Sequence, residues 1–230
     1  MSNPSPLTDV SPETLALLSR LHAQSLTQEA KVTTSDYADD VVDSRMKDTF
    51  IALDEDKCHF MYQLCLATNA KTIVEAGTSY GVSTIYLALA VAANTAATGG
   101  AGRVIATEHE PEKARQARQH WAECGDGDSV SDVIDLREGD LRETLKRDLG
   151  TVDLLLLDIW APLALPTLKL VQPSLRPGAV VLTDNTIGAE ARYRDLFAYM
   201  RAPDSGFRNL TIPYTKGLEM SVYLPGASAK

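Results

Sequence analysis

The fold is decided by one stretch, TIVEAGTSYG at residues 72–81. It is a short apolar run that ends in glycine and leads into a segment, 81–93, with the spacing of a helix. The same order of strand and helix repeats along the chain. Such alternation predicts an open α/β sheet, mainly parallel, with right-handed crossovers.

The same alternation of strand and helix predicts where the other elements lie. Strands are expected at 103–107, 133–137, 152–157 and 179–183. Helices are expected between and after them, at 111–123, 141–149, 162–175 and 190–200. Two late β-like runs, 208–213 and 219–224, flank a turn at 214–217 and predict an antiparallel hairpin. Before the first strand, apolar spacing predicts helices at 12–31, 44–53 and 56–68.

Length and composition favour a single domain. The chain has 230 residues, 44% of them hydrophobic and 23% charged, which are ordinary globular proportions. We expect a flexible tail over 1–10 and one domain over 11–230, in which the helices of 11–70 cover the mouth of the substrate site.

The net charge of −9 argues against a nucleic-acid partner, because such proteins usually cluster Lys and Arg. It favours a small-molecule ligand, although acidity that only aids solubility is an equal alternative. No apolar run reaches the roughly 20 residues of a membrane span. The three cysteines lack paired spacing, and no signal peptide opens the chain, so we expect a cytoplasmic protein and leave a homo-oligomer open.

Acidic residues mark the carboxyl ends of the expected strands, where ligands bind in open sheets of this kind. They are Glu75, Glu108, Asp140, Asp158 and Asp184. Five carboxylates on one rim repel one another unless a cation or hydrogen-bond donors compensate. We therefore predict a ligand-binding rim there.

The loop at 75–81 has glycine only at positions 77 and 81, so it matches the dinucleotide fingerprint poorly. Its acidic start suits a ligand that carries an ammonium group, such as the methionine part of S-adenosylmethionine. Glu108 can accept hydrogen bonds from both ribose hydroxyls, or it can be a charge near the start of a helix. Asp140 is equally consistent with a place near adenine and with a helix N-cap.

Two strand ends carry oxygen ligands. One strand runs into Asp158, and another runs into Asp184 and Asn185. Two carboxylates and an amide oxygen form a hard donor set suited to Mg²⁺.

In these motifs the sequence resembles the catechol O-methyltransferase-like family of class I methyltransferases. The resemblance spans roughly 72–224 and is carried by the Glu-x-Gly-x-x-x-Gly loop, Glu108, the Leu-Asp-x-Trp of 157–160, Asp184-Asn185 and the Gly-Leu-Glu of 217–219. It implies a Rossmann-like sheet of seven strands whose last strand is antiparallel, with extra N-terminal helices. It also implies an O-methyltransferase that uses S-adenosylmethionine and Mg²⁺ or another divalent cation on a small catechol-like or phenolic hydroxyl.

The resemblance also implies roles by motif position. Asp158, Asp184 and Asn185 are the expected metal ligands and catalytic centre, and Trp160 and Glu219 are expected to meet the substrate. The cofactor pocket is expected to be lined by Glu75, Gly77, Ser79, Gly81, Ser83, Glu108, His109, Gly139, Asp140, Leu141, Asp158 and Trp160.

One position departs from the family pattern. A lysine that commonly follows the Leu-Asp-x-Trp motif as general base is Ala161 here. A base contributes typically 10²–10⁴-fold to the rate. Either the metal alone ionises the substrate, or another residue serves, with Asp36, Tyr37, His109 and Lys216 as candidates, or the site has changed use. In that last alternative the chain still binds S-adenosylmethionine. It then catalyses methyl transfer without a metal, catalyses a different reaction, or holds the cofactor without any chemistry.

Overall fold

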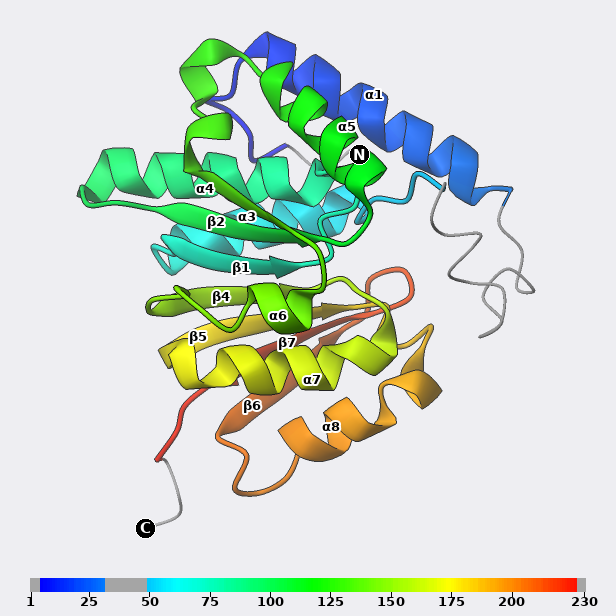
Figure 1. The fold of residues 1–230 in the computed structure, drawn as a ribbon, viewed down its shortest axis with the longest axis vertical. Coiled ribbons are helices and arrows are strands. Elements are labelled where there is room, and N and C mark those ends of the chain that lie inside the picture. Colours follow the sequence, from blue (N-terminus) through cyan, green and yellow to red (C-terminus); the bar gives the residue numbers. More distant parts are fainter. Residues whose placement is uncertain (1–4, 32–48, 227–230) are drawn as a thin grey trace.

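A single sheet organises the chain in the computed structural model, which describes residues 5–31 and 49–226 (Figure 1). Its strands are β1 (Thr72–Ala76), β2 (Arg103–Glu108), β3 (Ile134–Glu138), β4 (Val152–Leu157), β5 (Leu175–Asp184), β6 (Phe207–Ile212) and β7 (Leu218–Tyr223). Their order is β3-β2-β1-β4-β5-β7-β6. β7 runs antiparallel to both of its neighbours, β5 and β6, and the other strand pairs are parallel. The expected seven-stranded sheet with an antiparallel last strand is confirmed.

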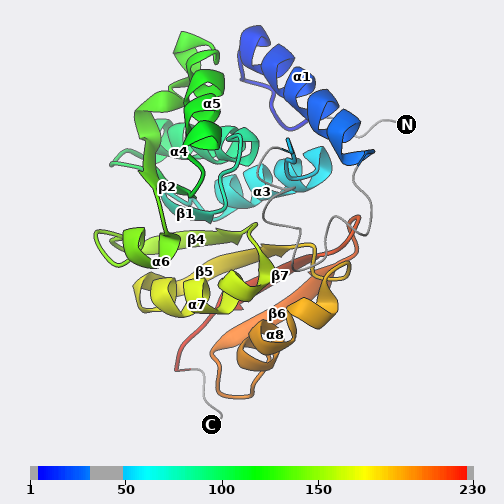
Figure 2. The same ribbon diagram turned by 45° about the vertical axis from the view of Figure 1, so that its right-hand side comes forward.

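Helices cover both faces of the sheet. They are α1 (Pro12–Glu29), α3 (Glu55–Ala67), α4 (Val82–Thr98), α5 (Pro111–Ala122), α6 (Leu141–Thr144), α7 (Ala161–Val171) and α8 (Arg194–Met200). In Figures 1 and 2, α3, α4 and α5 lie on one side of the sheet with α1 packed on them, and α6, α7 and α8 lie on the other.

The continuous apolar strands explain this arrangement, because successive side chains of a strand point to opposite faces. On β4, Leu154 and Leu156 enter the core beneath α3 and α4, whereas Leu155 and Leu157 enter the core beneath α7. All four side chains are fully buried. The same alternation fixes which face each residue at a strand end belongs to.

The expected helix at 44–53 is wrong over its described part, because residues 49–54 are irregular. The amide of Phe50 donates to Gln28 Oε1 (2.8 Å) and that of Ala52 donates to Ser25 Oγ (2.9 Å). These amides therefore bind side chains of α1 instead of helical carbonyls. The expected tail at 1–10 is described only from residue 5, and within it Leu7 is 4% exposed and packs in the core.

Three other expected helices are shorter than the sequence suggests. α6 ends at Thr144, where the Arg137 guanidinium donates hydrogen bonds to the carbonyls of Thr144 (2.9 Å) and Arg147 (2.7 Å). α7 ends at Val171 before a short 3₁₀ turn that contains a proline, which cannot donate to a continuing helix. The segment at 190–200 is split into a 3₁₀ turn and α8.

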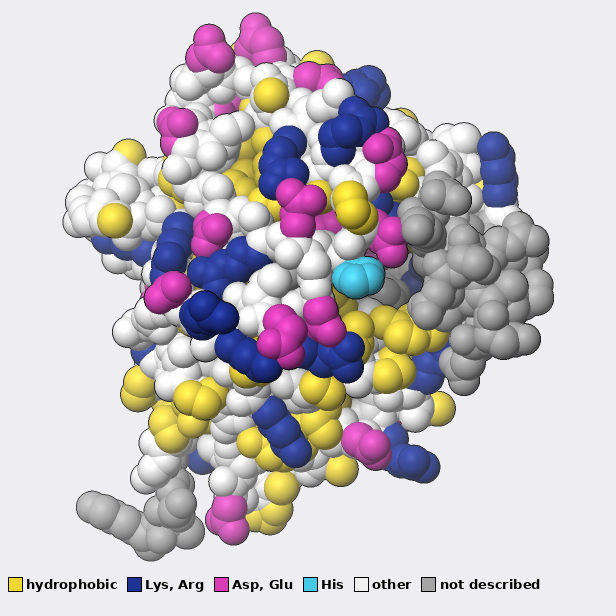
Figure 3. All heavy atoms as spheres, in the orientation of Figure 1, with side chains coloured by type: hydrophobic (Ala, Val, Ile, Leu, Met, Phe, Trp, Pro, Cys, Tyr) yellow, Lys and Arg dark blue, Asp and Glu magenta, His cyan; other side chains and the backbone are white. Residues whose placement is uncertain are grey.

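The described surface mixes charges of both signs. Figure 3 shows basic and acidic side chains interspersed on one face of the molecule. Exposed ion pairs such as Arg118–Glu138 and Lys146–Glu143 bring opposite charges into contact. Within residues 5–31 and 49–226, no helix has the length and apolar character that crossing a bilayer requires.

Candidate active site

The loop between β1 and α4 is built around a buried carboxylate. Glu75 is fully buried and accepts hydrogen bonds from the hydroxyls of Ser83 (2.6 Å), Thr84 (2.6 Å) and Thr78 (2.9 Å). Burial raises the pKa of Glu75, although the three hydroxyls oppose that shift. The carboxylate thus turns inward and ties the strand end to the first turns of α4. Its described partners are hydroxyls, so it shapes the loop from within.

Left-handed backbone lets the same loop turn sharply. Gly77 has φ +95°, Ser79 has φ +49°, and Gly81 caps α4 with φ +79°. A Cβ atom on Gly77 would lie 2.1 Å from the carbonyl oxygen of Asp158. Glycine at this position is therefore required both by its conformation and by the approach of the loop to the end of β4.

Glu108 links the loop to the end of β2. Its carboxylate accepts from the amides of Ser79 (2.7 Å) and Glu110 (2.8 Å). The residue is half-buried, beside the exposed His109. This contact sets the orientation of a carboxylate next to the glycine loop, at the position that one of the two sequence-based interpretations assigns to the ribose.

At the end of β3, Asp140 makes the contact of a helix N-cap. Asp140 caps α6, since its carboxylate accepts from the amide of Arg142 (2.9 Å) and is paired with that residue's guanidinium (2.7 Å). The guanidinium beside it lowers the pKa of Asp140 to about 2. Gly139, with φ +112°, and Leu141 flank this cap. The N-cap interpretation is confirmed.

The end of β5 meets a buried lysine from α3. Lys57 is 1% exposed, and its Nζ lies 2.6 Å from Asp184 Oδ1 and 2.9 Å from Asp54 Oδ2. The other oxygen of Asp184, Oδ2, accepts from the side-chain amide of Asn185 (2.7 Å). Burial alone would lower the pKa of Lys57, but the two carboxylates raise it, so the ammonium form is favoured.

Asp158, at the end of β4, differs from the other rim carboxylates. Among the residues that the structure describes, no side chain or amide donates a hydrogen bond to its carboxylate. Burial raises the pKa of Asp158 well above its usual range, and the nearby charges of Asp184 and Glu75 add to that effect. The group therefore lies close enough to Asp184 for their charges to interact, and none of residues 5–31 and 49–226 donates to it.

Trp160 and Ala161 follow at the start of α7. The Arg192 guanidinium lies 4.7 Å from the centre of the Trp160 ring, and the Ala161 methyl packs in the core beneath α7. Ala161 is 8% exposed and holds no proton-accepting group.

Glu219 is not brought to the acidic rim. Its neighbour on β7, Leu218, packs in the core beneath α3 and α4, so Glu219 points to the opposite face of the sheet. There its carboxylate, 2% exposed, pairs with Arg201 (2.9 Å) and accepts from the Thr211 hydroxyl. The sequence-based substrate role for Glu219 therefore finds no supporting contact in the described residues.

Two of the candidate bases, Asp36 and Tyr37, lie outside the described residues. His109 is exposed, and Lys216 Nζ is 3.4 Å from Glu29 Oε2 at the surface. Neither contacts Asp158 or Asp184.

The donor chemistry of Asp158, Asp184 and Asn185 suits a hard divalent cation, since all three carry oxygen and the two carboxylates repel each other. Both oxygens of Asp184, however, already accept hydrogen bonds, one from Lys57 and one from Asn185. A divalent ion at this set would have to share Asp184 with the Lys57 ammonium and would need the side-chain oxygen of Asn185, whose nitrogen now faces Asp184.

Sequence reasoning missed Lys57. A signal was present, because Lys57 shares the buried side of α3 with Cys58, Met61 and Cys65. A lysine at such a position is rarely buried unless it is paired. Its partner on β5 lies 127 residues further along the chain, which no local pattern reveals.

Comparison with known proteins gives a consistent result. Residues 74–186 match a family described as a methyltransferase domain. Catechol O-methyltransferases of Niastella koreensis and Mycobacterium tuberculosis are 28% and 30% identical over 144 and 138 residues, each alignment covering 60% of this chain. The alignments span 59% and 58% of those relatives' own length.

A solved structure extends the likeness to nearly the whole fold. The O-methyltransferase TomG of Streptomyces achromogenes, involved in tomaymycin synthesis and solved with SAM, aligns with a TM-score of 0.66 at 21% identity. The alignment covers 96% of this chain and 93% of TomG. At that identity the likeness establishes the fold.

The glycine requirement at position 77 is testable against a matched glycine. Gly77→Ala and Gly99→Ala both place a side chain at positive φ, which costs about 1–3 kcal/mol. At Gly99 no atom lies within 4 Å of the added Cβ, whereas at Gly77 it meets the Asp158 carbonyl. In urea unfolding, we expect Gly77→Ala to lose at least about 2 kcal/mol more than Gly99→Ala. Equal losses would contradict the close approach of loop and strand.

Proposed function

We propose that this chain, which belongs to the catechol O-methyltransferase-like class I methyltransferases, transfers a methyl group from S-adenosylmethionine to a hydroxyl of a small acceptor. One observation carries the proposal. The glycine loop after β1 lies directly against the end of β4, where Asp158 has no described donor. A methyl donor bound on the loop would therefore lie beside an acceptor bound at the ends of β4 and β5.

The described residues supply the binding part of this reaction. The positive-φ backbone of 77–81 allows close approach of a ligand, and Glu108, oriented by two amides, can accept from ribose hydroxyls. Glu75 keeps the loop rigid from inside the core through its three hydroxyl partners. TomG, whose structure contains SAM, shares this fold, which supports the choice of cofactor.

The chemical step forms a C–O bond and breaks a C–S bond. The acceptor oxygen attacks the methyl carbon, the electron pair of the broken bond stays on sulfur, and the hydroxyl proton is lost to a base or to solvent. The protein contributes alignment and exclusion of water, which can supply a large part of the rate enhancement.

Mg²⁺ assistance and a catechol-like or phenolic acceptor are the finer part of the proposal. The oxygen donors that would hold the ion are Asp158, Asp184 and Asn185. When bound, a divalent ion lowers the pKa of a coordinated hydroxyl and so favours its ionised form. The two catechol O-methyltransferases among the relatives support this acceptor class. No described contact favours the alternative of a cofactor-binding chain with changed chemistry.

Cofactor binding is tested by replacing a single carboxylate. Glu108→Gln should weaken S-adenosylmethionine binding about tenfold to a hundredfold in calorimetry, because a charged acceptor becomes neutral. The matched control is Glu138→Gln, since Glu138 pairs with Glu108 in the sheet register but binds the exposed Arg118. Equal affinities in the wild type and Glu108→Gln would remove the ribose role of Glu108.

Methyl transfer is tested directly with the wild-type chain. Incubation with S-adenosylmethionine and a panel of catechols and simple phenols should yield S-adenosylhomocysteine and an O-methylated product, both measured by mass spectrometry. A chelator should lower turnover, and added Mg²⁺ should restore it. No product from any acceptor would contradict the activity, whereas turnover that ignores the chelator would contradict only the role of the ion.

A further inference from the structure

The Lys57 side chain places a positive charge among the carboxylates at the edge of the sheet. It reaches the end of β5 from α3, and its ammonium lies between Asp184 Oδ1 (2.6 Å) and Asp54 Oδ2 (2.9 Å). Asp54 is the N-cap residue of α3, yet its carboxylate makes no capping hydrogen bond to the helix. Both carboxylates are thus directed to the lysine.

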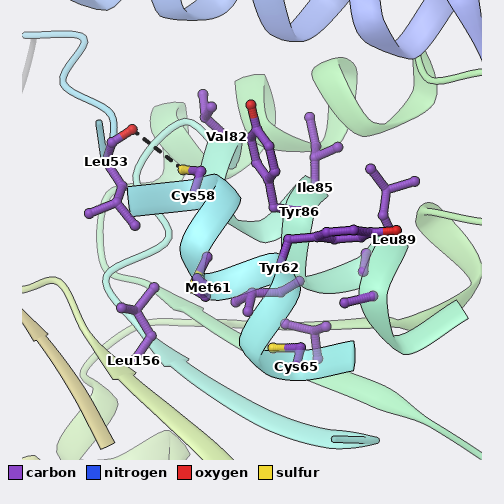
Figure 4. Close-up of a cluster of buried hydrophobic side chains, with 14 of the residues drawn as sticks. Leu53, Cys58, Met61, Tyr62, Cys65, Val82, Ile85, Tyr86, Leu89 and Leu156 are labelled. Atoms are coloured by element: carbon purple, nitrogen blue, oxygen red, sulfur yellow. Dashed lines mark hydrogen bonds between the residues drawn. The ribbon is translucent and has the colours of Figure 1, made fainter. Parts of the chain in front are cut away.

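Packing of α3 holds the lysine in this place. Figure 4 shows the core around the next turns of α3, where Cys58, Met61, Tyr62 and Cys65 pack against side chains of α4 and Leu156 of β4. Cys58, Met61 and Cys65 are fully buried. The start of α3 therefore stands at a fixed distance from the end of β5, and Lys57 bridges the two elements.

Charge at the rim remains unbalanced despite this lysine. Two carboxylates, those of Asp54 and Asp184, face the single Lys57 ammonium, and Asp158 lies near enough to Asp184 for the two groups to interact. The remaining negative charge attracts a further cation. A divalent ion on Asp184 would, however, lie within a few ångströms of the Lys57 ammonium, and two cations at that separation repel each other strongly.

We propose that Lys57 and a divalent cation compete for the Asp184 carboxylate, so that the lysine sets how tightly the rim binds the ion. This inference rests on the cation part of the proposed function. The lysine holds Asp184 when no ion is present, and the ion binds only as the ammonium withdraws from Oδ1. Lys57 is in this sense a residue that tunes cation affinity.

The test measures Mn²⁺ binding by the electron paramagnetic resonance signal of the free ion, without any turnover. Lys57→Met should bind Mn²⁺ at least about tenfold more tightly than the wild type, because the competing charge is gone. Lys146→Met is the matched control, since it removes one exposed positive charge and should change affinity by less than about twofold. Unchanged or weaker binding by Lys57→Met would overturn the proposal.

A second measurement uses the wild-type chain and does not depend on the variant folding. Lysine acetylation, followed by mass spectrometry, should show Lys57 protected without metal and labelled several-fold faster at saturating Mn²⁺, with Lys146 unchanged. Protection of Lys57 that persists with Mn²⁺ bound would overturn the competition.

Parallel titrations with S-adenosylmethionine separate this proposal from the broader one. If neither the wild type nor Lys57→Met binds Mn²⁺ while both bind the cofactor, the competition and the ion's role fail together and methyl transfer stands. If both bind Mn²⁺ equally, only the competition fails.

Discussion

The structure depends on how the negative charges of the carboxylates at one edge of the sheet are balanced by neighbouring donors and cations. Parallel strands bring their carboxyl ends together, and here an acidic residue lies near the end of each of the first five strands or just past it. Buried or half-buried carboxylates are stable only with donors or cations beside them. The carboxylate of Glu75 accepts hydrogen bonds from hydroxyls, that of Glu108 accepts from backbone amides, and that of Asp184 pairs with the Lys57 ammonium. Asp158 has no donor among the described residues, and burial raises its pKa well above the usual range.

The same contacts connect the core to the function. Packing of α3 on the sheet carries Lys57 to Asp184, and the hydroxyls that neutralise Glu75 fix the start of α4. Donor loop and acidic rim are consequently parts of one rigid framework. In the competition proposed above, the cation affinity of this edge depends on whether Lys57 or a divalent ion faces Asp184.

Much of the fold was predictable, because continuous apolar strands such as Leu154–Leu157 and the spacing of the helices are local signals. The irregular 49–54 segment was not predictable, since its amides bind side chains of α1. At the site, the strand-end carboxylates followed from the alternation of elements, but the Lys57–Asp184 pair joins residues far apart in sequence. Glu219 points away from the face on which its neighbour Leu218 packs, because successive side chains of a strand alternate between faces. The motif position had suggested a contact with the substrate instead.

An X-ray structure of the chain with S-adenosylhomocysteine, grown without divalent metal, tests the account most directly. The account predicts that the Lys57 Nζ lies within hydrogen-bonding distance of both Asp54 and Asp184, and that the ligand's ribose binds Glu108 beside the 77–81 loop. A Lys57 side chain turned to solvent, with Asp184 held by other donors, would contradict it.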